Sequence, residues 1–263
     1  MNRKRCAALC AALVLSVSAA FAQTEADFNV ALTEDGEGAV ITRYTGKAAA
    51  MSIPATIQGM PVREIGRRAF RFNETVTSVV IPAGVTKIGN SAFFSCYRLT
   101  SVTIPEGVTE ICESAFDRCE QLTEAALPKS LKTLREKAFS GTAITAVTIP
   151  AGTKAGEYVF MNCNNLKNVT LPEDMEYIPN EMFANCGALT AITLPASIKE
   201  IGWRAFATYG SSNLFTVTIP DSVETINFRA ISYGGSSDAF KGCSNLSLAS
   251  QAALKKRGYK GRF

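Results

Sequence analysis

The sequence predicts a repeat solenoid, a fold in which short coils of chain stack along one axis. Two recurring features carry this prediction. An apolar residue followed by proline recurs at Ile53-Pro54, Ile81-Pro82, Ile104-Pro105, Leu127-Pro128, Ile149-Pro150, Leu171-Pro172, Leu194-Pro195 and Ile219-Pro220. A phenylalanine follows in every unit, at Phe70, Phe93, Phe116, Phe139, Phe160, Phe183, Phe206 and Phe240. From Pro82 to Pro195 successive prolines are 23, 23, 22, 22 and 23 residues apart, which predicts about eight similar coils between residues 48 and 246.

Each coil is expected to begin with a short strand. In the unit that starts at Leu99, the segment Val102-Thr103-Ile104 alternates apolar and polar side chains, as a half-buried strand does. Pro105 ends the strand because it has no N–H for the ladder. Val108 and Ile111, three residues apart, then turn an apolar edge back toward the interior. One coil buries too little apolar surface to fold alone, so the coils must stack.

The second half of each coil is expected to carry the phenylalanine inward. The segment Ser114-Ala115-Phe116 predicts a short helical turn in which Phe116 fills the layer. Gly66, Gly89 and Gly202 follow the second apolar edge of their coils, and this placement predicts backbone positions with positive φ.

The first 22 residues have the pattern of a signal peptide. Arg3, Lys4 and Arg5 form a basic start, the run from Cys6 to Ala20 is apolar or small, and Ala20-Phe21-Ala22 supplies a cleavage site. The apolar run is shorter than the ~20 residues that span a bilayer. No later run approaches that length, so no membrane span is predicted. The sequence therefore predicts export to the periplasm, the cell surface or the medium, and leaves the mode of attachment open.

The two ends of the repeat region are expected to be capped. Residues 23–47 predict an N-terminal β-hairpin whose turn contains Glu34, Asp35 and Glu37. These acids lack the spacing of a calcium loop and are interpreted as a turn. Residues 247–263 predict a basic helical cap or tail, with helix-forming composition from Leu248 to Arg257.

Composition excludes several classes of chemistry. The chain of 263 residues contains no histidine, which removes Ser-His-Asp and Cys-His catalysis and His-ligated metal sites. From Gln23 to Phe240 the net charge is 18 − 23 = −5, so a basic groove for nucleic acid is not predicted. The C-terminal tail is predicted to be the only polybasic feature of the exported chain.

Cysteines outside the signal peptide fall mostly at one repeat position. Five of the six, at Cys96, Cys119, Cys163, Cys186 and Cys243, lie three residues after the phenylalanine; the sixth is Cys112. This equivalence favours buried thiols. Disulfides between adjacent coils, Cys96 with Cys119 and Cys163 with Cys186, stay open as an alternative. No metal site or cofactor is predicted, because side chains at one repeat position form a column rather than a tetrahedron.

The candidate partner-binding face is the outward column of the predicted strands. Its members are Thr103, Thr148, Thr170, Thr193 and Thr218, which alternate with the core residues of each strand. Trp203 replaces a polar residue and is either an exposed anchor or a side chain packed on a neighbouring Arg or Phe. The Gly- and Ser-rich insertion at residues 228–238 is interpreted as a surface loop, with binding as the alternative.

These motifs resemble a known repeat family. The pattern of Leu99, Val102, Ile104, Pro105, Val108, Ile111, Ala115, Phe116 and Cys119 looks like the BspA-type leucine-rich repeat. The resemblance implies a right-handed leucine-rich-repeat coil with a parallel β-ladder, found mainly in exported bacterial surface proteins. Some family members are adhesins for host matrix or plasma proteins or for other cells.

The resulting functional hypothesis is a non-enzymatic, exported module that binds host proteins or cell surfaces. The alternative is a structural or self-assembling envelope protein without a foreign ligand. Paired acids such as Glu110 and Glu113, or Glu173, Asp174 and Glu176, suggest a glycosidase only weakly, because they fall on predicted turns with no evident pocket.

Overall fold

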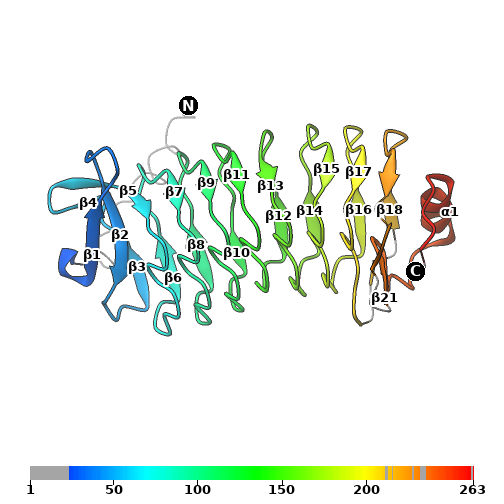
Figure 1. The fold of residues 1–263 in the computed structure, drawn as a ribbon. Helices are drawn as coiled ribbons and strands as arrows, with labels where there is room; N and C mark the ends of the chain where they lie inside the picture. Colours follow the sequence, from blue (N-terminus) through cyan, green and yellow to red (C-terminus); the bar gives the residue numbers. More distant parts are fainter. Residues whose placement is uncertain (1–23, 211–212, 215, 227, 232–234, 262) are drawn as a thin grey trace, which may run out of the picture.

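The computed structural model describes residues 24–210, 213–214, 216–226, 228–231, 235–261 and 263, and the predicted signal peptide lies outside them. Figure 1 shows a stack of similar coils that runs from the N-terminal hairpin at one end to a helix at the other. The predicted repeat solenoid is therefore confirmed, and three sides of each coil can be described in turn.

The first side, which we call the strand wall, consists of the strands that precede the prolines. Within each of its three sheets neighbouring strands pair in parallel and in register, so that Val79 lies opposite Val102 and Val147 lies opposite Val169. The strands are β3 (Ala50–Ser52), β6 (Ser78–Val80), β8 (Ser101–Thr103), β10 (Glu124–Ala125), β12 (Ala146–Thr148), β14 (Asn168–Thr170), β16 (Ala191–Thr193) and β18 (Thr216–Thr218).

The second side is a ladder of shorter strands that follows each proline turn. It begins with β2 (Ala39–Tyr44) and β5 (Met60–Ile65), and a short β4 (Thr56–Ile57) pairs antiparallel with β5. The remaining strands are β7 (Lys87–Ile88), β9 (Glu110–Ile111), β11 (Thr133–Leu134), β13 (Lys154–Ala155), β15 (Tyr177–Ile178), β17 (Glu200–Ile201) and β19 (Thr225–Ile226). Its isoleucines, such as Ile88 and Ile111, are buried, except for Ile226, which is half-buried.

The third side, which we call the turn wall, carries the phenylalanines. The predicted helical turn is replaced here by successive tight turns, because Ser114 and Arg118 have φ of 54° and 59°, which no right-handed helix accommodates. Their N–H groups donate instead to the next coil, Ser114 to Glu136 at 2.9 Å and Arg118 to Ser140 at 2.8 Å. The turn wall is thus a third ladder between coils.

The interior is organised around a continuous column of stacked aromatic rings. From Phe70 to Phe240 each ring stacks on the next, with centroids between 4.6 and 6.1 Å apart. All eight side chains are buried. The recurring phenylalanine therefore marks a shared core, as the repeat spacing predicted.

The glycines after the second apolar edge have a different role from the one predicted. The prediction of positive φ at Gly66, Gly89 and Gly202 is wrong, because none of the three is among the positive-φ residues of the described chain. A Cβ on Gly89 would lie 2.9 Å from the carbonyl oxygen of Ile65 and from backbone atoms of the coil before it. These glycines allow the close approach of two coils, and the left-handed conformations fall mostly on Ser, Asn and Arg of the turn wall.

Both ends of the stack are covered. At the N-terminal end β1 (Phe28–Leu32) and β2 form an antiparallel hairpin preceded by a short 3-10 turn, Glu25–Asp27, and Tyr44 stacks on Phe70 with centroids 5.2 Å apart. At the other end helix α1 (Leu248–Lys256) begins after the capping residue Ser247, whose hydroxyl accepts from the Ser250 N–H. Tyr259 then packs edge-on against Phe240.

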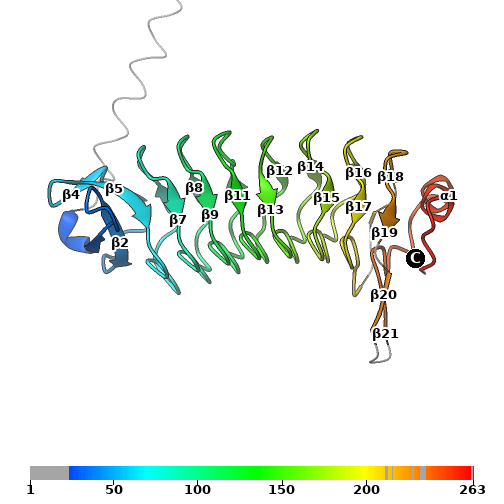
Figure 2. The same ribbon diagram turned by 45° about the horizontal axis from the view of Figure 1, so that its top comes forward.

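The insertion before the last phenylalanine forms a hairpin rather than an irregular loop. Strand β20 (Phe228–Ile231) pairs antiparallel with β21 (Gly235–Asp238). Figure 2 shows that this hairpin projects away from the body of the solenoid. Across the described ranges, no helix has the length and apolar character needed to cross a bilayer.

Candidate binding surfaces

The strand wall presents the predicted threonine column to solvent. Thr103, Thr148, Thr170, Thr193 and Thr218 are all exposed, and Val80 and Ala126 occupy the same column. The alternate residues of the same strands, such as Val102 and Val147, are buried. This follows from the period of two along a strand, so the exposure of these threonines could be predicted from the sequence.

A second outward column on the strand wall carries almost no charge. It contains the residues that open each strand, Ser78, Ser101, Glu124, Ala146, Asn168, Ala191 and Thr216. Glu124 is its only ionised side chain. Beside this column the hydroxyl of Thr100 donates to the Thr77 carbonyl at 2.9 Å, and that of Thr123 donates to the Thr100 carbonyl at 3.3 Å. The wall is a small-residue surface on which, apart from Glu124 and Asn168, the polar side chains of the two columns are hydroxyls.

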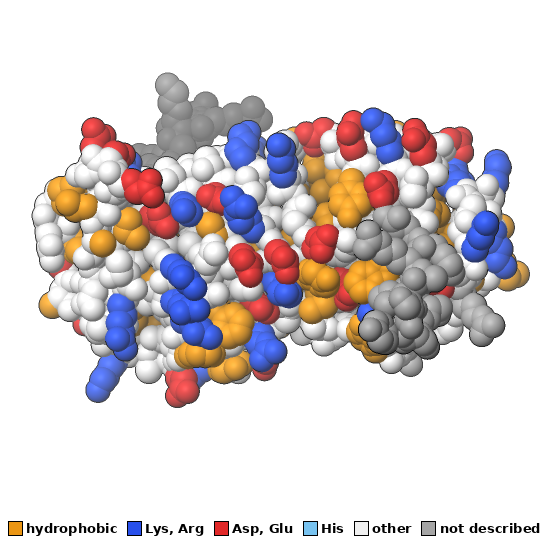
Figure 3. Space-filling model, viewed as in Figure 1, with side chains coloured by type: hydrophobic (Ala, Val, Ile, Leu, Met, Phe, Trp, Pro, Cys, Tyr) orange, Lys and Arg blue, Asp and Glu red, His pale blue; other side chains and the backbone are white. Residues whose placement is uncertain are grey.

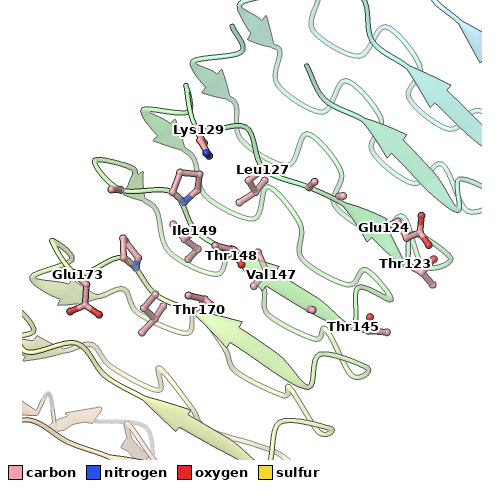
Figure 4. Close-up of a pocket in the computed structure, with 17 residues that line it drawn as sticks. Thr123, Glu124, Leu127, Lys129, Thr145, Val147, Thr148, Ile149, Thr170 and Glu173 are labelled. Atoms are coloured by element: carbon pink, nitrogen blue, oxygen red, sulfur yellow. The ribbon is translucent and has the colours of Figure 1, made fainter. Parts of the chain in front are cut away.

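A groove crosses the strand wall between β10 and β12. Among the described residues no backbone hydrogen bond joins these two strands, although β8 pairs with β10 and β12 pairs with β14. The groove has a volume of about 910 Å³. Figure 4 shows Leu127, Val147 and Ile149 along its middle, with Lys129 and Glu173 toward one end and Glu124 at the other.

Two local features of the chain explain why the ladder opens here. Ala125 and Ala126 stand where the neighbouring coils carry Val and Thr, and alanine favours a strand less than β-branched residues do. The path from the phenylalanine to the apolar residue before the next strand is also one residue shorter in this coil. From Phe139 to Ile144 the difference is 144 − 139 = 5, whereas from Phe116 to Leu122 in the coil before it is 122 − 116 = 6. Correspondingly, the rings of Phe139 and Phe160 have the widest separation of the stacked column, 6.1 Å.

A second, smaller hollow lies at the next interruption of the strand wall. Strands β14 and β16 are not paired, and a hollow of about 290 Å³ between them is lined by Thr170, Thr190 and Thr193, among others. Neither groove was predicted from the sequence. For the groove between β10 and β12 the available signals were the Ala-Ala pair and the change in coil length, and neither signal occurs at the hollow between β14 and β16.

Trp203 is half-buried and belongs to the turn wall rather than to the threonine face. Its backbone N–H donates to Asn180 Oδ1 at 2.7 Å, and the Arg204 guanidinium lies 5.2 Å from its ring centroid. Of the two predicted alternatives, the structure therefore has the second: Trp203 packs on a neighbouring arginine. The five threonines and Trp203 do not form one site.

Three of the acids noted in the sequence, Glu110, Asp174 and Glu176, make contacts between coils. Glu110 is ion-paired with Arg135, and Glu176 is ion-paired with Lys199. Asp174 accepts a hydrogen bond from the Gly152 N–H at 2.7 Å. In the N-terminal hairpin, hydrogen bonds from the Thr33 hydroxyl and the Glu37 N–H lower the pKa of Asp35. In the described part of the chain no group of three or more Cys, Asp or Glu side chains is placed to hold a metal ion.

The cysteine column is a set of free thiols that donate to the backbone. The thiol of Cys119 donates to the Phe93 carbonyl at 3.1 Å, and that of Cys163 donates to the Phe139 carbonyl at 3.2 Å. Cys96, Cys186 and Cys243 repeat this bond to the coil before them. The six cysteines of the described residues are all free, so the alternative of disulfides between adjacent coils is not what the structure has. Five of them are buried, as the favoured prediction stated, and Cys186 is half-buried.

These thiols are expected to resist alkylation in the folded protein. Burial raises the pKa of Cys163 from 9.0 to about 11 and raises that of Cys119 as well, so almost no thiolate exists near neutral pH. Iodoacetamide at pH 8, with labelling read at each cysteine by peptide mass spectrometry, should modify these two residues only after urea is added. Since the folded state holds these thiols protonated, its stability should fall as the pH rises through the range from 9.0 to about 11. Rapid labelling of Cys163 without urea would contradict an enclosed column.

The chain is similar to one family of repeat proteins and to several solved structures. The family model described as "BspA type Leucine rich repeat region" matches residues 48–155 and 153–255, in six copies. A leucine-rich repeat protein from Bacteroides ovatus is 29% identical with a TM-score of 0.66; the match covers 75% of this chain and 53% of that one. The leucine-rich repeat protein TpLRR of T. pallidum is 27% identical with a TM-score of 0.61; the match covers 92% of this chain and 98% of that one.

A leucine-rich repeat protein from Eubacterium ventriosum shares the fold at 19% identity, with a TM-score of 0.51 and coverage of 76% of this chain and 59% of that one. No curated protein matches the chain. The chain thus spans about half of the Bacteroides ovatus protein and nearly all of the T. pallidum protein. Because the family model matches most of the chain over the region that forms the coils, the protein belongs to the BspA-type leucine-rich repeat family.

Proposed function

We propose that this protein is an exported, non-enzymatic module that binds other proteins through its strand wall, in surface adhesion or in recognition of host proteins or cell surfaces. The observation that carries the proposal is the composition of the strand wall. The two outward columns of the strand wall contain a single ionised side chain, Glu124. A groove of about 910 Å³ interrupts this wall.

Such a surface suits a protein partner. Small side chains let a partner's backbone approach closely, and the hydroxyls of Thr148 and Thr170 offer both donors and acceptors. Leu127, half-buried at the groove, supplies apolar area that a partner can cover. The charged residues of the groove, Glu124, Lys129 and Glu173, lie at its ends. A partner that covers the middle of the groove therefore desolvates little charge, as at the core of a protein–protein interface.

Export is supported by the N-terminal pattern in residues 1–22, with its basic start, apolar run and small-residue cleavage site. A non-enzymatic role is supported by the absence of histidine from the sequence and by the acids of the coils. Glu110 and Glu176 form ion pairs between coils, an arrangement expected of acids that contribute to the fold.

The proposal is tested by charging the strand wall. The purified protein is screened against an array of extracellular and cell-surface proteins, and hits are measured again with Thr148→Lys and Thr170→Lys together. Both threonines line the groove, so this variant should bind a true partner at least about tenfold more weakly. Thr109→Lys is the matched control, because Thr109 is also exposed but lies outside the strand wall.

Two outcomes would count against the proposal. One is a partner whose affinity is equally reduced by Thr109→Lys, since binding would then not use the strand wall. The other is an array without any partner while sedimentation shows concentration-dependent assembly, which would favour the structural, self-associating alternative.

A further inference from the structure

The turn wall of the first two coils carries an exposed cluster of arginine and aromatic side chains. The guanidinium of Arg71 lies 4.3 Å from the ring centroid of Phe72 and 5.3 Å from that of Phe94. The two rings meet edge to face at 5.6 Å. In Figure 3, Lys and Arg side chains gather around hydrophobic ones on the lower left of the face. We call Arg67, Arg68, Arg71, Phe72, Phe94, Tyr97 and Arg98 the arginine–aromatic patch.

Phe72 occupies a position where the fold does not favour a phenylalanine. Its φ is 60°, a left-handed conformation that is strained for a bulky side chain, and the residue is 51% exposed. The same position in the next five coils is held by Ser95, Arg118, Gly141, Asn162 and Asn185, all with positive φ. Gly and Asn tolerate this conformation best, and none of the five is an apolar aromatic residue. Exposing a phenylalanine in a strained backbone costs stability, and residues of this kind cluster at functional sites.

The arginines of the patch are not used by the fold. Arg67, Arg68, Arg71 and Arg98 are exposed, and none of them forms an ion pair within the described residues. By contrast, Arg135 on the second side is paired with Glu110. Residues 66–75 and 89–98 together contain four arginines and one acid, a net charge of 4 − 1 = +3.

This charge is local and sharply bounded. The equivalent residues of the third coil, 112–121, carry 1 − 3 = −2, with Glu113 and Glu120 exposed and Asp117 buried, so an acidic segment adjoins the patch. A long polyanion such as a duplex or a polysaccharide would run onto that acidic coil and be repelled. A short segment of extended polypeptide, at about 3.3 Å per residue, would stay within two coils.

We propose that the arginine–aromatic patch is a docking surface for a short acidic segment of a partner protein, one that carries aspartate or glutamate next to an apolar or aromatic residue. Arginine suits this role because its planar fork binds a carboxylate through two parallel hydrogen bonds. Arg71 already lies against two rings, which limits the freedom it must lose on binding. Exposed aromatic and arginine side chains are also the residue types that dominate binding energy at protein interfaces.

The proposal goes beyond the function proposed above, since it concerns a different wall and a different partner chemistry. The probe is a fluorescein-labelled peptide that alternates Glu and Tyr, and its binding is followed by fluorescence anisotropy. Arg71→Gln and Phe72→Asn should each weaken binding about tenfold, the scale of an interface hot spot. Phe72→Asn introduces the residue found at Asn162 and Asn185, so the fold is expected to be retained.

Four controls make the result decisive. Arg135→Gln removes an exposed arginine outside the patch and should leave peptide binding unchanged, as should Thr148→Lys with Thr170→Lys on the strand wall. A peptide with Lys in place of Glu should not bind. Thermal unfolding of each variant identifies any that has lost its fold.

The proposal is overturned if the Glu-Tyr peptide does not bind, or if it binds folded Arg71→Gln and Phe72→Asn as tightly as the wild type. Heparin and a single-stranded oligothymidine are titrated in parallel. If either binds more tightly than the peptide and loses affinity in the same variants, the patch is a site for another class of polyanion and the peptide proposal is wrong.

Discussion

Replacing Phe116 by alanine is expected to lower the free energy of unfolding by about 3–5 kcal/mol, the usual cost of removing a buried phenylalanine. Phe116 is fully buried, and its ring stacks on Phe93 at 5.1 Å and on Phe139 at 5.0 Å. The cavity would interrupt the aromatic column in the middle of the stack, where covalent chain on both sides prevents the coils from closing the gap.

Urea unfolding followed by circular dichroism measures this loss. Phe72→Ala is the matched control, because it removes the same side chain from an exposed position on the same wall. We expect it to cost less than about 1 kcal/mol. Equal destabilisation by the two substitutions would mean that the recurring phenylalanines do not share a core.

Most of the architecture could be predicted because the same residue types return at fixed intervals. Pro105 ends a strand and Phe116 enters the core for reasons that are local to one coil, and repetition makes them recognisable eight times over. The exposure of Thr103 and Thr148 follows from strand alternation alone. Their role in binding stays a prediction, as does the signal peptide in residues 1–22.

Features that depend on contact between coils were harder to predict from the sequence. Gly89 suggested positive φ, whereas its lack of a side chain is needed because a neighbouring backbone lies 2.9 Å from where a Cβ would be. The predicted helical turn failed for a related reason: Ser114 and Arg118 turn their N–H groups toward the next coil instead of along their own chain. These constraints on the backbone come from the neighbouring coils, so the residues of a single repeat give little sign of them.

The candidate surfaces show the same limit. The C-terminal tail was predicted to be the only polybasic feature, and the structure corrects this. Arg71 and Arg98 are far apart along the chain, yet lie on the same wall of adjacent coils. Similarly, the groove between β10 and β12 coincides with the Ala125-Ala126 pair and with one missing residue between Phe139 and Ile144, whose effect is visible only when both coils are placed.

Removing one whole coil is expected to leave a folded protein, whereas removing half a coil is not. Deletion of residues 93–115 joins Ala92 to Phe116, which keeps the phenylalanine, cysteine and proline columns in register. Deletion of residues 93–103 instead places Ile104 and Pro105 where the aromatic column requires Phe93. Because stability in a solenoid is close to a sum over neighbouring coils, only the first deletion preserves the interfaces on both sides.

Urea unfolding of these two deletions tests the stacked-coil account most directly. The account predicts that the whole-coil deletion unfolds in one cooperative transition, with an m-value reduced in proportion to the buried surface it has lost, and that the half-coil deletion shows no such transition. If both variants were unfolded, or if both unfolded cooperatively with the same midpoint, the coils would not be interchangeable layers around one interior.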